Sequence, residues 1–158
     1  MIEFENNSAS SIVVCIDTFN PSEEALRYSC IKAVKNNLKL HILVVIDVAE
    51  KNLIFGAKVI ENQKREKIEN KIRDLIDKVC FEFKITPVIS IREGNIAIEI
   101  IKELKLNNIA MVVFGKSQNS QSDEIVLPKI INTIGNKIKI PVIIIPENVD
   151  KIFLELNL

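Results

Sequence analysis

A polar loop that follows a buried strand carries the residues best suited to chemistry in this sequence. The apolar run 109–114 leads into Gly115 and Lys116, and a polar stretch then continues to Pro128 and Lys129. Open parallel sheets bind ligands beyond the carboxyl ends of their strands. Gly115 is the loop's single glycine, so main-chain N–H groups have little room to approach a phosphate. Gly115, Lys116 and Lys129 are therefore candidate binding residues, although both lysines also fit as ordinary solvated cations.

Asp17 is a candidate of the same kind, because it directly follows the apolar run 11–16. Its carboxylate could contact a ligand, or it could accept N–H groups of the turn that it begins. The sole histidine, His41, stands at the start of another apolar run, with no serine, cysteine or metal-ligand partner in the motif regions. We interpret it as a structural or surface residue.

The common catalytic motifs do not occur in the chain. The sequence contains no dinucleotide glycine fingerprint, Walker loop, zinc-ligand spacing or nucleophile elbow. We therefore expect no independent catalytic centre, no metal site and no enzymatic function, with weak nucleotide hydrolysis left open.

Composition limits the partners and the compartment. The 158 residues include 21 basic and 21 acidic side chains, so bulk charge favours neither nucleic acid nor a membrane surface as partner. The first ten residues are polar and acidic, unlike a secretory signal, and no apolar run is long enough to span a bilayer. Cys15, Cys30 and Cys80 occur singly, and we interpret Cys15 and Cys30 as small apolar packing residues. A reducing cytoplasm is the expected location.

Apolar runs alternate with helical patterns along the whole chain. Apolar periodicity predicts strands at 11–16, 40–46, 85–91, 109–114 and 141–145, with helices at 21–37, 59–80, from 94 past 104, and from 126 to about 135. Asn20 is the expected cap of the first helix, with Pro21 at its first position. Pro87 predicts that the third strand lies at the sheet edge. Gly135 is the expected end of the last helix.

This alternation predicts an α/β fold with one Rossmann-like, doubly wound sheet. Right-handed crossovers give five parallel strands in the order 3-2-1-4-5, with helices on both faces. The switch point then lies between the first and fourth strands, where Asp17 and Gly115 converge. We expect a polar segment at 1–10, one domain at 11–146 and an apolar tail at 147–158, docked on its own subunit or on a second one.

From about Ser11 to Pro146 the chain resembles the universal stress protein family. The matching segments are Ile12–Asp17 with Pro21–Leu26, Leu43–Asp47, Glu93–Gly94, Ile125–Leu127 and Ile140–Ile145. In nucleotide-binding members, an acid after the first strand and a valine late in the second hold the adenine side. The resemblance assigns these positions to Asp17 and Val45.

The family's phosphate loop has a glycine, two residues, a second glycine, nine residues, and a third glycine followed by serine or threonine. Laid on this sequence, these positions fall on Gly115, Gln118, Pro128 and Lys129. Gln118 adds a side chain, and Pro128 removes an N–H group. The resemblance therefore implies weak or absent ATP binding through a degenerate motif, with Lys116 and Lys129 offsetting part of the loss by charge.

The leading hypothesis is a cytoplasmic, homodimeric stress-response or regulatory protein that needs no cofactor. The resemblance implies that the dimer forms through the edge strand Val142–Ile145, with the tail extending the contact. The alternative is an ATP-binding switch that uses Asp17, Val45 and Gly115 with Lys129, accompanied by Mg²⁺. A phosphorylated receiver domain fits poorly, because clustered acids after the first strand are missing. A flavin or nicotinamide enzyme on the same fold also stays open.

Overall fold

The computed structural model describes residues 10–16, 18, 21–47, 58–106, 108–116 and 128–150. Five parallel strands form one sheet in the order β3-β2-β1-β4-β5. The strands are β1 (Ser11–Ile16), β2 (Lys39–Asp47), β3 (Val88–Gly94), β4 (Ile109–Lys116) and β5 (Val142–Pro146). The predicted fold class and strand order are confirmed, since nearly continuous aliphatic runs suit strands that are buried on both faces.

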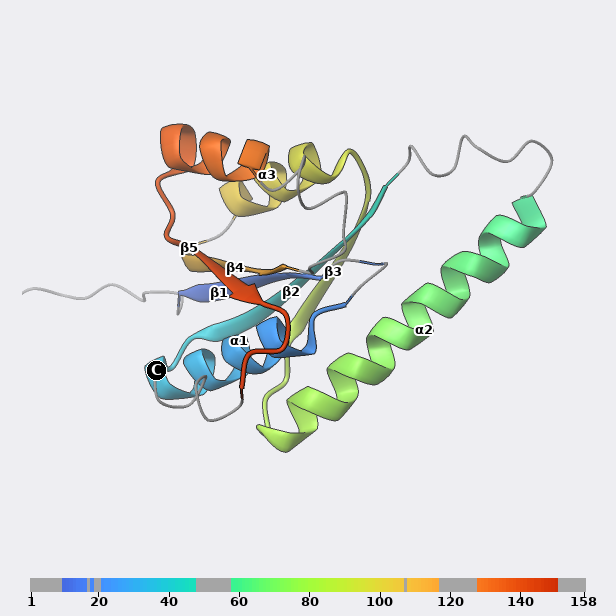
Figure 1. Cartoon of the computed structure of the whole chain (residues 1–158), viewed down its shortest axis with the longest axis horizontal. Helices are drawn as coiled ribbons and strands as arrows, with labels where there is room; N and C mark the ends of the chain where they lie inside the picture. Colours follow the sequence, from blue (N-terminus) through green and yellow to red (C-terminus); the bar gives the residue numbers. More distant parts are fainter. Residues whose placement is uncertain are drawn as a thin grey trace, which may run out of the picture.

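Helices cover both faces of the sheet (Figure 1). On one face lie α1 (Glu23–Asn36) and α2 (Lys58–Glu82). On the other lie α3 (Ile96–Leu106) and the helix 128–133, which continues into the wider turn η2 (Ile134–Ile138). Each face has its own aliphatic cluster, so alternate residues of β1 and β2 enter different cores.

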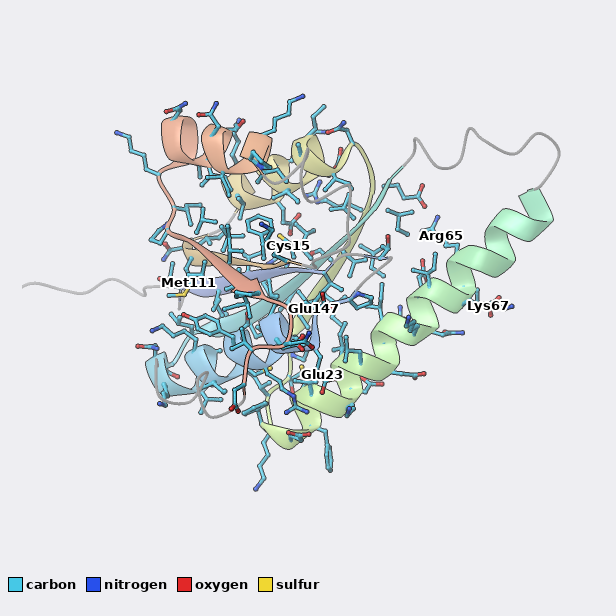
Figure 2. The ribbon with its side chains drawn as sticks, in the orientation of Figure 1. Cys15, Glu23, Arg65, Lys67, Met111 and Glu147 are labelled. Atoms are coloured by element: carbon cyan, nitrogen blue, oxygen red, sulfur yellow. The ribbon has the colours of Figure 1, made fainter. Side chains whose placement is uncertain are left out.

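The C-terminal half of α2 supplies the helix's fully buried residues among those described. Ile72, Ile76 and Val79 are buried there, whereas the N-terminal half projects beyond the sheet (Figure 1). Figure 2 shows Arg65 and Lys67 on the projecting half. Arg65 Nε donates to Glu69 Oε1 at 2.9 Å, and Arg65 Nη1 forms an ion pair with Glu93 Oε1 on β3. This ion pair ties the projecting half to the edge strand. Within the described residues, no helix has both the length and the apolar character needed to cross a membrane.

The first helix begins two residues later than predicted. Ser22, in an extended conformation, is its cap, and the Ser22 hydroxyl accepts the N–H of Ala25 at 3.0 Å. Pro21 therefore lies outside the helix, and Asn20 lies outside the described residues. The prediction was wrong because serine is as good a cap as asparagine, and the local sequence offers both.

The third strand is shifted relative to the prediction. It spans Val88–Gly94 and not 85–91, so Pro87 lies before the strand. Lys84 adopts a left-handed conformation (φ 53°) after α2 and turns the chain, and pairing with β2 begins only at Val88. The predicted edge position of this strand is nevertheless confirmed.

The last helix runs past Gly135, contrary to the prediction. Gly135 lies inside η2, and the chain turns at Lys139, whose left-handed backbone donates an N–H to the Ile134 carbonyl at 2.8 Å. The glycine is therefore not the terminator here. After β5, Glu147 donates its N–H to the Lys116 carbonyl at 2.9 Å, and Val149 packs against the α1/α2 core. The remainder of the predicted tail, 151–158, lies outside the described residues.

Candidate functional site

The carboxyl ends of three adjacent strands form the edge where the sequence predicted a site. Ile16 at the end of β1 pairs with Val44, and Cys15 pairs with Phe114. Val45 and Gly115 each follow one of these paired residues, and Lys116 ends β4. Parallel topology thus brings Val45, Gly115 and Lys116 to one edge, beside the switch point between β1 and β4.

Asp17 lies outside the described residues, so the structure places four of the five predicted binding residues. Its neighbour Thr18 is buried, with 9% of its surface exposed.

Val45 is largely enclosed by its own chain. Its side chain is 6% exposed and belongs to the cluster on the α3 face, together with Ile100 and Phe114. A nucleotide base that approached this strand end would contact side chains that are already packed in the core.

Gly115 is required by packing. A Cβ built on Gly115 would lie 2.2 Å from the Cβ and 2.5 Å from the Oγ of Ser22. The first glycine of the loop is thus explained by the close approach of the α1 cap to β4. Its presence is not by itself a sign of a phosphate site.

Lys116 and Lys129 are both exposed. Lys116 ends β4, and its carbonyl accepts the N–H of Glu147. Pro128 and Lys129 are both helical, and the Lys129 carbonyl accepts the hydroxyl of Thr133 at 3.0 Å. A proline at position 128 presents no main-chain N–H group to an anion.

A buried polar network on the α3 face was missed by the sequence analysis. His41 Nε2 lies 2.8 Å from Ser90 Oγ and 3.0 Å from Glu103 Oε1. The Ser90 hydroxyl donates to Glu103 Oε1 at 3.1 Å, and Arg92 Nε donates to Glu103 Oε2. His41 is 6% exposed and Glu103 is 4% exposed. The view of His41 as a residue without partners was therefore wrong, whereas its structural role is supported.

The network resembles a nucleophilic triad in composition but not in geometry. In a triad, the serine and the carboxylate contact different ring nitrogens of the histidine. Here Ser90 and Glu103 both contact Nε2. Because the Ser90 hydroxyl already donates to Glu103, Nε2 must itself donate a hydrogen, and it cannot accept the serine proton. The network therefore fixes α3 on β2 and β3 and does not activate Ser90.

A sequence signal for this network existed. Glu103 lies between Ile100 and Leu104 in the apolar stripe of its helix. Ser90 and Arg92 are two residues apart in their strand, so both side chains lie on the same face of the sheet. An acid on a core-facing stripe calls for donors on the facing strand. The pairing still required knowledge of which strands lie under the helix.

Two further observations bear on chemistry at the sheet. Burial raises the pKa of the Cys15 thiol, and the nearby Glu103 carboxylate raises it further. Figure 2 shows Cys15 between the sheet and the α3 layer. This thiol is accordingly a poor nucleophile. Among the residues that the structure describes, no three His, Cys, Asp or Glu side chains gather as a potential metal site.

Solved structures of low sequence identity share the fold. A Burkholderia pseudomallei protein from the universal stress protein family has a TM-score of 0.61 and 15% identity, covering 89% of this chain and 98% of its own. The Lactobacillus plantarum universal stress protein UspA has a TM-score of 0.60 and 14% identity, covering 88% and 99%. An Archaeoglobus fulgidus universal stress protein in complex with dAMP has a TM-score of 0.51 and 15% identity, covering 86% and 97%.

Sequence comparison gives the family itself. No curated protein sequence matches the chain significantly. The model of the universal stress protein family matches residues 9–146, which include all five strands and every described helix. The chain therefore belongs to the universal stress protein family.

Proposed function

We propose that this chain acts as a cytoplasmic stress-response or regulatory protein without enzymatic turnover, and that it binds ATP weakly or not at all. The observation that carries the proposal concerns Gly115 and Pro128, the two residues that border the loop where phosphate would bind. Ser22 fills the space beside Gly115, and Pro128 in the following helix has no main-chain N–H group. Neither position offers what a phosphate needs there, which is open room at a glycine and a free main-chain N–H group.

The expected loss of affinity is large. The family motif would place glycines at 118 and 128 and a hydroxyl at 129, where this chain has Gln118, Pro128 and Lys129. Losing two or three phosphate hydrogen bonds, each worth roughly 1.5–3 kcal/mol, reduces affinity by about three orders of magnitude or more. The exposed ammonium groups of Lys116 and Lys129 offset a fraction of this, because exposed charges interact weakly in water.

Isothermal titration of the purified protein with ATP and Mg²⁺ tests the proposal. Mass spectrometry of any small molecule that co-purifies should come first, because a retained nucleotide would mask the site. We expect no saturable heat at millimolar ATP. Saturation in the micromolar range would contradict the weak-binding proposal and favour a nucleotide-responsive protein.

We also propose that the protein is a homodimer through β5. Among the described residues, β5 pairs with β4 and is the last strand of the sheet, so its other edge can pair with a further strand. Ile144 on this strand is 38% exposed, whereas Ile145 is buried. Antiparallel pairing of two such edges across a two-fold axis would satisfy both sets of backbone groups.

A nucleotide-responsive switch is the second candidate function. Solved relatives in complex with dAMP and with cAMP favour it. These ligands carry one phosphate, so they depend less on an extended glycine loop than a triphosphate does. Val45, Gly115 and Lys116 lie at one edge of the sheet, and Lys129 lies in the helix that follows β4 along the chain.

The variant Asp17→Ala tests this second function. It should abolish binding of dAMP, cAMP or ATP with Mg²⁺ if the adenine side is held as in the family. Unchanged affinity in Asp17→Ala would reject the proposed pocket. Lys116→Gln should weaken nucleotide binding modestly and make the affinity less dependent on salt concentration, because it removes a single exposed charge.

A further inference from the structure

Two cysteines face each other across the contact between α1 and α2. Cys30 lies on α1 and Cys80 on α2, and both belong to the same buried cluster under the sheet. Cys30 has no exposed surface and Cys80 is 4% exposed. The two thiols are near enough for each to shift the pKa of the other. Among the described cysteines, Cys15 lies on the opposite, α3 side of the sheet.

Ion pairs beside the cysteines hold the two helices in this alignment. Arg27 lies one helical turn before Cys30, and its Nη1 donates to Glu82 Oε2 at 2.6 Å. Glu23, a further turn away, accepts from Lys78 Nζ at 3.4 Å. Figure 2 shows Glu23 where α1 meets the C-terminal part of α2. Glu82 and Lys78 flank Cys80, so the cysteine-bearing turns are fixed against each other.

The interaction between the two thiols shifts their pKa values in opposite directions. The hydrogen bond with Cys80 raises the pKa of Cys30, and burial raises it further. The hydrogen bond with Cys30 lowers the pKa of Cys80, against the opposing effect of burial. Cys80 is thus the thiol that ionises first.

We propose that Cys30 and Cys80 form a redox modification site, at which a peroxide converts the thiol pair into an intramolecular disulfide between α1 and α2. In the first step, the Cys80 thiolate attacks one peroxide oxygen. An S–O bond forms, the O–O bond breaks, and hydroxide leaves. In the second step, Cys30 sulfur attacks the sulfenic sulfur of Cys80. The S–S bond forms, and the sulfenic oxygen leaves as water with the Cys30 proton.

The two steps balance with the thiols and the peroxide as the only reactants. The two thiols together lose two electrons, one peroxide molecule gains them, and two water molecules result. A dithiol reductant reverses the reaction by thiol–disulfide exchange. Cys15 lacks a thiol neighbour in this arrangement and cannot resolve a sulfenic acid in the same way.

Peptide mapping of the full-length chain tests the proposal. The reduced protein is treated with hydrogen peroxide, unfolded, alkylated and digested with trypsin. We expect the peptides Tyr28–Lys32 and Val79–Lys84 to be joined, while Cys15, in peptide Met1–Arg27, is alkylated. The intact mass should fall by about 2 Da, and dithiothreitol should restore it. The oxidised form should melt about 5–15 °C higher than the reduced form, because the crosslink restricts the unfolded chain.

Matched variants make the result specific. Cys15→Ser should keep the joined peptides, whereas Cys30→Ala and Cys80→Ala should each lose them together with the rise in Tm. If a core variant does not fold, the wild-type peptide map still decides. Links that involve Cys15, links only between molecules, or alkylation of both Cys30 and Cys80 while a reference dithiol in the same tube is oxidised would each overturn the proposal.

Discussion

The backbone of Gly115 lies directly against the side chain of Ser22, so that a Cβ at residue 115 would fall 2.2 Å from the serine Cβ. This contact joins the end of β4 to the cap of α1. It places two requirements on one pair of residues, since Ser22 must cap the helix and residue 115 must have no side chain. Gly115 is therefore a packing residue first, whatever else binds near it.

The first prediction concerns this contact. Gly115→Ala should destabilise the fold by about 1–3 kcal/mol, because neither backbone nor cap can move away cheaply. Ser22→Gly should cost only a few tenths of a kcal/mol, since glycine is tolerated at a cap. The double variant should recover much of the Gly115→Ala loss, as measured by a urea-unfolding cycle.

Gly135→Ala is the matched control for that cycle. A Cβ there meets nothing within 4 Å, and the residue lies in a helical turn. This substitution should be neutral or stabilise by up to about 1 kcal/mol. Simple additivity of Gly115→Ala and Ser22→Gly would show that the two residues do not collide.

The second prediction concerns acid stability. The hydrogen bond from Arg27 is the main reason that the pKa of Glu23 lies below its usual range. A depressed pKa contributes stability above the unfolded-state value of about 4.3, and this contribution is lost as the pH falls through the folded pKa. Arg27→Gln should therefore reduce stability at neutral pH and flatten its fall between about pH 5 and pH 3.

Lys35→Gln is the control for this acid effect, because Lys35 is an exposed cation on the same helix. Its unfolding curve should keep the wild-type pH dependence. Urea unfolding at several pH values measures both variants. An unchanged pH slope in Arg27→Gln would mean that Arg27 does not stabilise the Glu23 carboxylate.

The third prediction concerns the network under α3. Glu103→Ala leaves Arg92, Ser90 and His41 without their common acceptor, and it should destabilise the fold by about 3–5 kcal/mol. Glu103→Gln keeps one acceptor oxygen and should cost less. Glu66→Ala removes an exposed acid from α2 and should stay within about 0.5 kcal/mol of wild type. If Glu103→Ala and Glu66→Ala lowered the free energy of unfolding equally, the network would not contribute to stability.

The fold was largely predictable from the sequence, for a physical reason. A sheet buried on both faces needs continuous aliphatic runs, and runs such as 12–14 and 42–45 are unambiguous. Errors arose where two residues of equal propensity compete, as with Asn20 and Ser22, or where one backbone angle shifts a register, as Lys84 does before β3. Such choices depend on tertiary contacts that periodicity does not contain.

The site was predictable only in part. Parallel topology was enough to bring Val45, Gly115 and Lys116 to one edge. The contact between Gly115 and Ser22 was not predictable, because it depends on how closely a helix approaches a strand. The partners of His41 come from β3 and α3, and no local pattern joins them.

The fourth prediction concerns the proposed dimer. Ile144→Lys places a charge on the outer strand β5, where the wild-type side chain is 38% exposed. The folded chain should then sediment as a monomer at micromolar concentration, because a buried lysine would oppose edge pairing. Val34→Lys on α1, at a residue that is 57% exposed, is the control and should stay dimeric. A monomeric wild type, or a dimeric Ile144→Lys, would contradict the β5 interface.

The last prediction restores what the loop lacks. The triple variant Gln118→Gly, Pro128→Gly, Lys129→Ser gives the chain the glycine spacing and the hydroxyl of the family's phosphate loop. Residue 128 then offers a main-chain N–H group, and the hydroxyl of residue 129 adds a donor. Each restored donor is worth about 1.5–3 kcal/mol, so ATP affinity should rise by about 10²-fold or more in calorimetric titration.

Pro128→Ala separates the two effects of the proline in the same titration. It returns the N–H group but keeps a Cβ, so its affinity should fall between those of the wild type and the triple variant. If the folded triple variant binds ATP no better than wild type, another residue at the carboxyl-end edge of the sheet limits the affinity. The packing of Ser22 on Gly115 would then be the next contact to relieve, because it occupies the first glycine of the same loop.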